Sequence, residues 1–102
     1  MNEHDIQREA VDLLRDEGYI VCVTSNRRHT ANTKGTPDVL VALHSALWLG
    51  LEFKQPGGKL TQEQETLYAH GNIRVVTSAK EALKAVKFAE RNHVTIKHTG
   101  DE

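Results

Sequence analysis

The sequence has 102 residues, of which 38% are hydrophobic and 26% are charged, and its formal net charge is −1. These values are typical of one globular domain and argue against a generally basic nucleic-acid-binding protein. No apolar run approaches the ~20 residues of a membrane span, and residues 1–10 lack the pattern of a signal peptide. The single cysteine, Cys22, excludes an internal disulfide. We therefore expect a protein of the reducing cytoplasm.

The first half of the chain predicts a helix followed by three strands. Residues 3–17 carry apolar side chains at helical spacing between Asn2, a good N-cap, and Gly18, a good stop. A polar segment rich in turn residues, 25–36, predicts a loop between the first two strands. The predicted strands are 19–24, 37–43 and 47–54.

The second half predicts two more helices with a strand between them. A T-x-x-Q capping box at 61–64 begins a helix that ends near Gly71. A strand at about 73–77 follows, and a second capping box at 78–81 begins a helix that runs to about Arg91.

The tail, residues 92–102, is expected to be flexible apart from a short edge strand at 94–96. The chain contains no internal repeat and no linker. The predicted order of elements is αβββαβα, so we interpret residues 1–102 as a single α/β domain with a mixed sheet.

Three charged residues stand in segments that otherwise predict core strands. Side chains alternate along a strand, so Glu52 and Lys54 share one face of the segment 47–54. Asp38 begins the preceding strand, and the short turn between the two strands predicts an antiparallel hairpin. Provided that the faces of the two strands match, Asp38, Glu52 and Lys54 are therefore expected to converge at one edge of the sheet.

This constellation suits metal-assisted chemistry on a phosphate. Two carboxylates provide the oxygen ligands that Mg²⁺ or Mn²⁺ prefers, and a lysine beside such a site can hold a water or a phosphate oxygen. The alternative is a structural ion pair between Lys54 and Asp38 or Glu52, because short patterns of this kind also occur by chance.

The motifs around these residues resemble a known family. The segments G-T-P-D at 35–38, E-F-K at 52–54 and K-Q-P-G-G-K-L-T-Q-E-Q at 54–64 resemble the VRR-NUC branch of the PD-(D/E)xK nuclease superfamily. The resemblance covers about residues 3–87. It implies an αβββαβ restriction-endonuclease-like core and a DNA endonuclease that depends on Mg²⁺ or Mn²⁺.

The resemblance also implies roles for individual residues. Asp38, Glu52 and the backbone carbonyl of Phe53 would hold the metal, and Lys54 would be the catalytic lysine. Gln64 matches the glutamine that the family carries on its next helix and is a further catalytic candidate. A capping box with Thr61 explains Gln64 equally well, and the two interpretations are compatible.

One more acid is implied on the first helix. The family places a glutamate ahead of an Ile-Gln pair, which matches Glu3 ahead of Ile6 and Gln7. Glu3 and Gln7 lie on one stripe beside the apolar face, whereas Glu9 lies on the polar face. Glu3 is thus a candidate catalytic residue and metal ligand, and the alternative is an acid that interacts with the helix dipole.

Basic residues gather in the segment 25–60, where five Lys or Arg face two acids. The net charge of this segment is +3 in a chain whose total is −1. Four of these residues are expected to contact phosphates, which positions DNA without reading its sequence: Arg27, Arg28, Lys34 and Lys59. The alternative is that exposed loops commonly carry such residues.

Substrate and assembly follow from the resemblance alone. Small stand-alone relatives are similar to junction-resolving enzymes that act as two-fold dimers, so the expected protein is a homodimer that cleaves branched DNA such as four-way junctions. The alternatives are a nuclease-fold module that binds nucleic acid or protein without cutting, and a sequence-specific restriction-type nuclease.

Overall fold

The computed structural model describes residues 1–24, 35–44 and 46–100, with side chains as far as residue 92. Its elements follow the predicted order: α1 Glu3–Asp16, β1 Ile20–Val23, β2 Val39–Ala42, β3 Trp48–Phe53, α2 Gln62–His70, β4 Ile73–Val76 and α3 Ala79–Gly100. Among the described residues, no helix is both long and apolar enough to cross a membrane.

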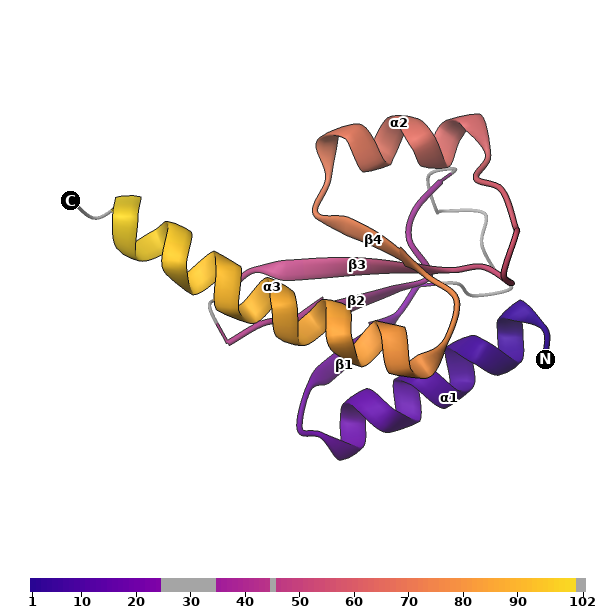
Figure 1. The fold of residues 1–102 in the computed structure, drawn as a ribbon, viewed down its shortest axis with the longest axis horizontal. Coiled ribbons are helices and arrows are strands. Elements are labelled where there is room, and N and C mark those ends of the chain that lie inside the picture. The colour runs from indigo at the N-terminus through magenta and orange to yellow at the C-terminus, as the bar shows by residue number, and fades with distance from the viewer. Residues whose placement is uncertain (25–34, 45, 101–102) are drawn as a thin grey trace.

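One mixed sheet forms the centre of the molecule (Figure 1), in the order β1-β2-β3-β4. The pairs β1–β2 and β2–β3 are antiparallel, which confirms the predicted hairpin, and β3–β4 is parallel. β3 is therefore internal, and five of its six residues are buried. A strand in this position holds its side chains rigidly, which matters for the two charged residues at its end.

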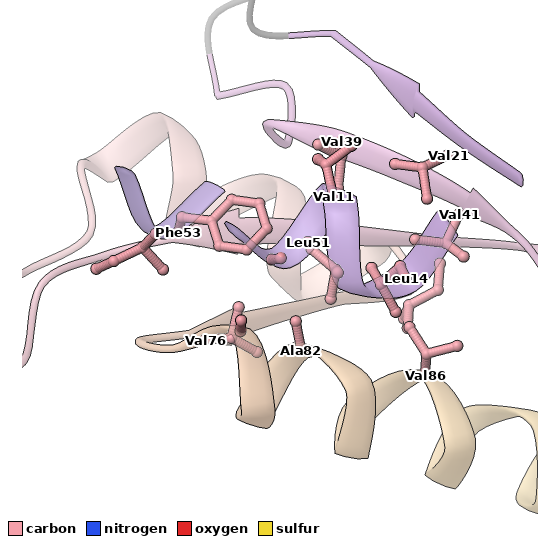
Figure 2. Close-up of a cluster of buried hydrophobic side chains, with 14 of the residues drawn as sticks. Val11, Leu14, Val21, Val39, Val41, Leu51, Phe53, Val76, Ala82 and Val86 are labelled. Atoms are coloured by element: carbon pink, nitrogen blue, oxygen red, sulfur yellow. The ribbon is translucent and has the colours of Figure 1, made fainter. Parts of the chain in front are cut away.

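Helices α1 and α3 cover the same face of the sheet (Figure 1). Their apolar sides meet the side chains of the strands in one cluster (Figure 2), and full burial of a Val, Leu or Phe side chain contributes about 1.5–3 kcal/mol. The labelled members of this core are Val11, Leu14, Val21, Val39, Val41, Leu51, Phe53, Val76, Ala82 and Val86.

Helix α2 lies on the opposite side of the sheet (Figure 1). No residue of α2 is buried, so this helix is held by a few individual contacts with the rest of the protein rather than by an apolar core of its own. On this side of the sheet, Pro37 packs close to the backbone of β3. A Cβ atom on Gly50 would stand 2.8 Å from the ring of Pro37 and 3.1 Å from Ile73. Gly50 thereby lets Pro37, which precedes Asp38, pack directly on β3.

The C-terminal helix is longer than the sequence predicted. α3 runs to Gly100, so the edge strand expected at 94–96 is wrong. Once a helix is nucleated, each added residue gains a hydrogen bond at low cost, and no glycine or proline interrupts the chain between Ala79 and Thr99. Within the described chain, the sheet contains four strands.

Candidate active site

Asp38 and Glu52 meet at the end of the β2–β3 hairpin. Val39 pairs with Leu51 in the register of this hairpin, so one further step places Asp38 opposite Glu52, on the same face. The backbone N–H of Phe53 donates a hydrogen bond of 2.8 Å to Oδ2 of Asp38. The aspartate is thus held against β3, and the structure brings together the two carboxyls as the alternation of the strands predicted.

The backbone around Asp38 is fixed from both sides. Its carbonyl accepts a 2.9 Å hydrogen bond from the N–H of Thr24, and the Thr24 hydroxyl donates to the carbonyl of Pro37. On the other side, Gly35 has φ +87° and lies against the first turn of α2. A Cβ atom there would stand 2.8 Å from the carbonyl of Glu63, so a glycine is required where the chain entering β2 passes under α2.

Gln64 connects α2 to Glu52. Its Nε2 donates a hydrogen bond of 2.7 Å to Oε2 of Glu52. Its Oε1 accepts a hydrogen bond of 2.9 Å from the N–H of Thr61, which completes the capping box of α2. The Gln64 side chain therefore caps α2 and contacts Glu52 at the same time, because an amide offers both a donor and an acceptor.

Lys54 lies beside the same carboxylate. Its Nζ is 3.9 Å from Oε2 of Glu52, and its side chain is only 12% exposed. This distance is longer than a hydrogen bond, so the contact is electrostatic and leaves the N–H groups of the ammonium available to another acceptor. The arrangement fits a catalytic lysine, and it equally fits the structural ion pair considered from the sequence.

The electrostatics of the two carboxyls favour a neutralising partner. Burial, together with the charge of Asp38, raises the pKa of Glu52 to about 7, and Lys54 opposes both effects. Burial also raises the pKa of Asp38, although the hydrogen bond from Phe53 lowers it. Two adjacent carboxylates cannot both ionise without cost, so the pair takes up either a proton or a cation.

The donor set fits a hard divalent cation. Oε1 of Glu52 is buried without a hydrogen bond of ordinary geometry, although Asp38 and the hydroxyl of Tyr68 interact with this carboxylate, and a bound cation would satisfy it. With Asp38 and a backbone carbonyl, the site offers the oxygen ligands that Mg²⁺ and Mn²⁺ prefer. Within the described part of the chain, no three His, Cys, Asp or Glu side chains gather as a metal-binding group. The fit therefore depends on the two carboxylates, and the carbonyl of Phe53 as a further ligand stays a prediction.

Glu3 lies at the edge of this arrangement. It is the first residue of α1, where the side chain of Asn2 caps the helix, and its own side chain is exposed. Its charge nevertheless raises the pKa of both Asp38 and Glu52, so it faces the site electrostatically. Direct metal ligation by Glu3 stays a prediction.

Tyr68 is a site residue that the sequence interpretation missed. It lies one helical turn after Gln64 on α2, and its buried hydroxyl faces the carboxylate of Glu52 without a hydrogen bond of ordinary geometry. Burial raises the pKa of Tyr68, and the charges of Glu52 and Asp38 raise it further. The neutral phenol therefore faces the carboxyls, and the i, i+4 spacing from Gln64 was the available signal.

The residues expected to contact DNA are mostly outside the described structure. Arg27, Arg28 and Lys34 lie in the undescribed segment 25–34, whereas Lys59 is exposed in the loop that precedes α2. Their contacts with phosphates stay predictions.

Comparisons with known proteins identify the fold. No protein-family model matches the sequence. No curated protein matches it either. A solved structure described as a VRR_NUC domain superposes with a TM-score of 0.64 at 24% sequence identity, over 83% of this chain and 94% of that chain. The chain therefore has the VRR-NUC nuclease fold, which confirms the restriction-endonuclease-like α/β core predicted from the motifs.

Proposed function

We propose that this protein is a DNA endonuclease that depends on Mg²⁺ or Mn²⁺. The observation that carries the proposal is the state of Glu52, whose Oε2 accepts from Gln64 while its buried Oε1 makes no hydrogen bond of ordinary geometry beside Asp38 and Tyr68. An internal strand that holds an unsatisfied carboxylate at its end is well suited to a cation site. The VRR-NUC fold supports the same conclusion.

Each side chain has a distinct task in this mechanism. Asp38, Glu52 and the carbonyl of Phe53 would hold the divalent ion. When bound, the ion acidifies a water molecule and offsets the charge that develops on the phosphate. Gln64 keeps Glu52 in one orientation through its 2.7 Å hydrogen bond.

Lys54 would act on the reacting groups. Its ammonium, held by the charge of Glu52 at 3.9 Å, is positioned to donate hydrogen bonds to the attacking water and to a phosphate oxygen. As the water oxygen bonds to phosphorus and loses a proton to the solvent, the bond from phosphorus to the leaving oxygen breaks and that oxygen takes up a proton from the solvent. Hydrogen-bond donors that are already in place stabilise the extra negative charge of this step without reorganisation.

For the substrate we propose branched DNA, cleaved by a homodimer. One chain carries one site, and a two-fold dimer supplies two sites for the paired cuts that a four-way junction requires. Contacts from Lys59, Arg27, Arg28 and Lys34 to phosphates would favour DNA shape over base sequence. The pair Lys54–Glu52 also suits a non-catalytic binding module, so this remains the competing function.

The decisive experiment combines cleavage with metal binding. The wild-type protein is incubated with labelled linear duplex, flap and four-way-junction DNA in Mg²⁺, Mn²⁺ or EDTA, beside Asp38→Asn, Glu52→Gln and the control Glu9→Gln on the exposed face of α1. We expect cleavage that EDTA stops, that both site variants lose and that the control retains. Calorimetry should show weaker Mn²⁺ binding in both site variants, and an unchanged affinity in both would reject the metal site.

A further inference from the structure

A second feature lies away from the carboxyls, in a groove of about 610 Å³ between β4 and α3. Neither Asp38 nor Glu52 lines it. β4 is an edge strand, so the groove opens at the border of the sheet. The side chains that give it chemical character are Arg74, Val75, Lys84, Lys87, Phe88 and Arg91.

The charge of the groove is positive. Four basic side chains line it, and the one acid in the lining, Glu81, already accepts hydrogen bonds of 2.7 and 2.9 Å from the backbone and hydroxyl of Thr77. Lys87 is also 4.0 Å from Glu17, but its side chain is 50% exposed, and ion pairs of this kind contribute little. A positive groove in a chain of net charge −1 points to an anionic partner.

The groove also contains a flat aromatic and cationic surface. The guanidinium of Arg74 lies over the ring of Phe88, 5.1 Å from its centroid, and Phe88 remains 44% exposed. Exposed aromatic rings and guanidinium planes are the surfaces on which unpaired nucleobases stack. A peptide of acidic residues would use the charges but not this platform.

The groove lies on the face of the sheet that α3 covers, opposite the face that carries the carboxyls, and the backbone of β3 and β4 joins the two. Val76, in its lining, pairs with Phe53, and the carbonyl of Val76 accepts a 3.0 Å hydrogen bond from the N–H of Lys54. From there the groove follows α3 from Glu81 to Arg91, a length of ~15 Å. That length accommodates about four stacked nucleotides at 3.4 Å each.

We propose that this groove binds an unpaired DNA strand, with phosphates on Lys84 and Lys87 and a base stacked on the Arg74–Phe88 platform. A duplex keeps its bases stacked inside and cannot use the platform. The choice of DNA rests on the proposed function, but strand binding itself requires no cleavage. The groove would hold the single-stranded arm of a branched substrate across the β4 edge of the sheet from the site.

Fluorescence anisotropy in EDTA tests the proposal with full-length protein, a labelled oligothymidylate and a blunt duplex of equal length. We expect the single strand to bind more tightly than the duplex. Phe88→Ala should weaken single-strand binding about tenfold, because stacking is removed. Trp48→Ala, which removes an aromatic side chain that is 50% exposed outside the groove, should leave binding unchanged.

Charge variants give an independent measurement. Lys84→Ala should reduce the slope of log affinity against log salt by about 0.7, the value for one contact to a single strand. Arg8→Ala removes the same charge from α1, outside this groove, and should leave the slope unchanged. Equal binding by duplex, or unchanged binding in both Phe88→Ala and Lys84→Ala, would overturn the groove proposal even if the protein cuts DNA. Strand binding that depends on both residues would support it even if no cleavage is found.

Discussion

The amide of Gln64 donates a 2.7 Å hydrogen bond to the carboxylate of Glu52 and joins α2 to the internal strand β3. α2 has no buried residue, so this bond is one of the few contacts that set the helix over the site. The same side chain also closes the N-terminal cap of α2 on Thr61. These two tasks can be separated experimentally.

Thr61→Ala removes the cap hydrogen bond that the Thr61 hydroxyl accepts and keeps the bond to Glu52, whereas Gln64→Ala removes the other hydrogen bond of the capping box together with the bond to Glu52. Each variant should lose about 1 kcal/mol of unfolding free energy, measured in urea. If the bond to Glu52 orients the carboxylate, only Gln64→Ala should also lose cleavage beyond the effect of stability. Equal cleavage in the two variants would reduce Gln64 to a capping residue.

Lys54→Ala should remove cleavage while Mn²⁺ affinity stays the same or increases, because a competing cation near Glu52 is gone. Cleavage assays and calorimetry measure the two effects. If Lys54 only forms a structural ion pair, the substitution should lower the melting temperature and leave cleavage in place. Lys80→Ala, which removes an exposed lysine of α3 outside the site and the groove, is a control that should retain cleavage.

The raised pKa of Glu52 predicts that the protein without metal loses stability as pH rises. The usual value of 4.5 applies to the unfolded chain and about 7 to the folded one, so between these values the folded state binds more protons. Unfolding free energy should therefore fall from pH 4.5 to pH 7, by at most on the order of 3 kcal/mol. The shift of Asp38 acts in the same direction.

Urea unfolding in EDTA across this range measures the effect. Glu52→Gln cannot titrate and should flatten the pH dependence. Saturating Mn²⁺ should restore stability at the upper end of the range, because the cation replaces the proton between the carboxyls. Equal slopes for wild type and Glu52→Gln would mean that Glu52 ionises normally in the folded protein.

Assembly on DNA is testable by light scattering with and without a four-way junction. We expect a homodimer that cleaves the junction faster than linear duplex. Arg27→Ala with Arg28→Ala should flatten the salt dependence of duplex binding by about 0.9 for each phosphate that the protein no longer neutralises. A monomer in both conditions, cutting linear duplex equally fast, would exclude a junction-resolving enzyme while leaving the nuclease proposal intact.

The sequence predicted those parts of the site that strands hold. Alternation placed Glu52 and Lys54 on one face and the short turn predicted the hairpin, but only the register of Val39 opposite Leu51 in the structure puts Asp38 on that same face. Tyr68 escaped prediction because α2 has no apolar stripe to show which side faces the protein. The end of α3 was misplaced because β-branched residues near 94–96 also fit a strand, and continuation of a formed helix overrides that preference.

The close approach at Gly35 has a consequence for local stability. α2 is nine residues long, shorter than a helix that is stable alone in water, and it is joined to the body through the glycine contact and polar side chains. Its amides should exchange with deuterium through a local opening that leaves β3 protected. The carboxylates on the strands would then stay in place while α2, which carries Gln64, opens and closes. The fraction of molecules in which α2 is closed, rather than the stability of the core, would set how often the site is complete.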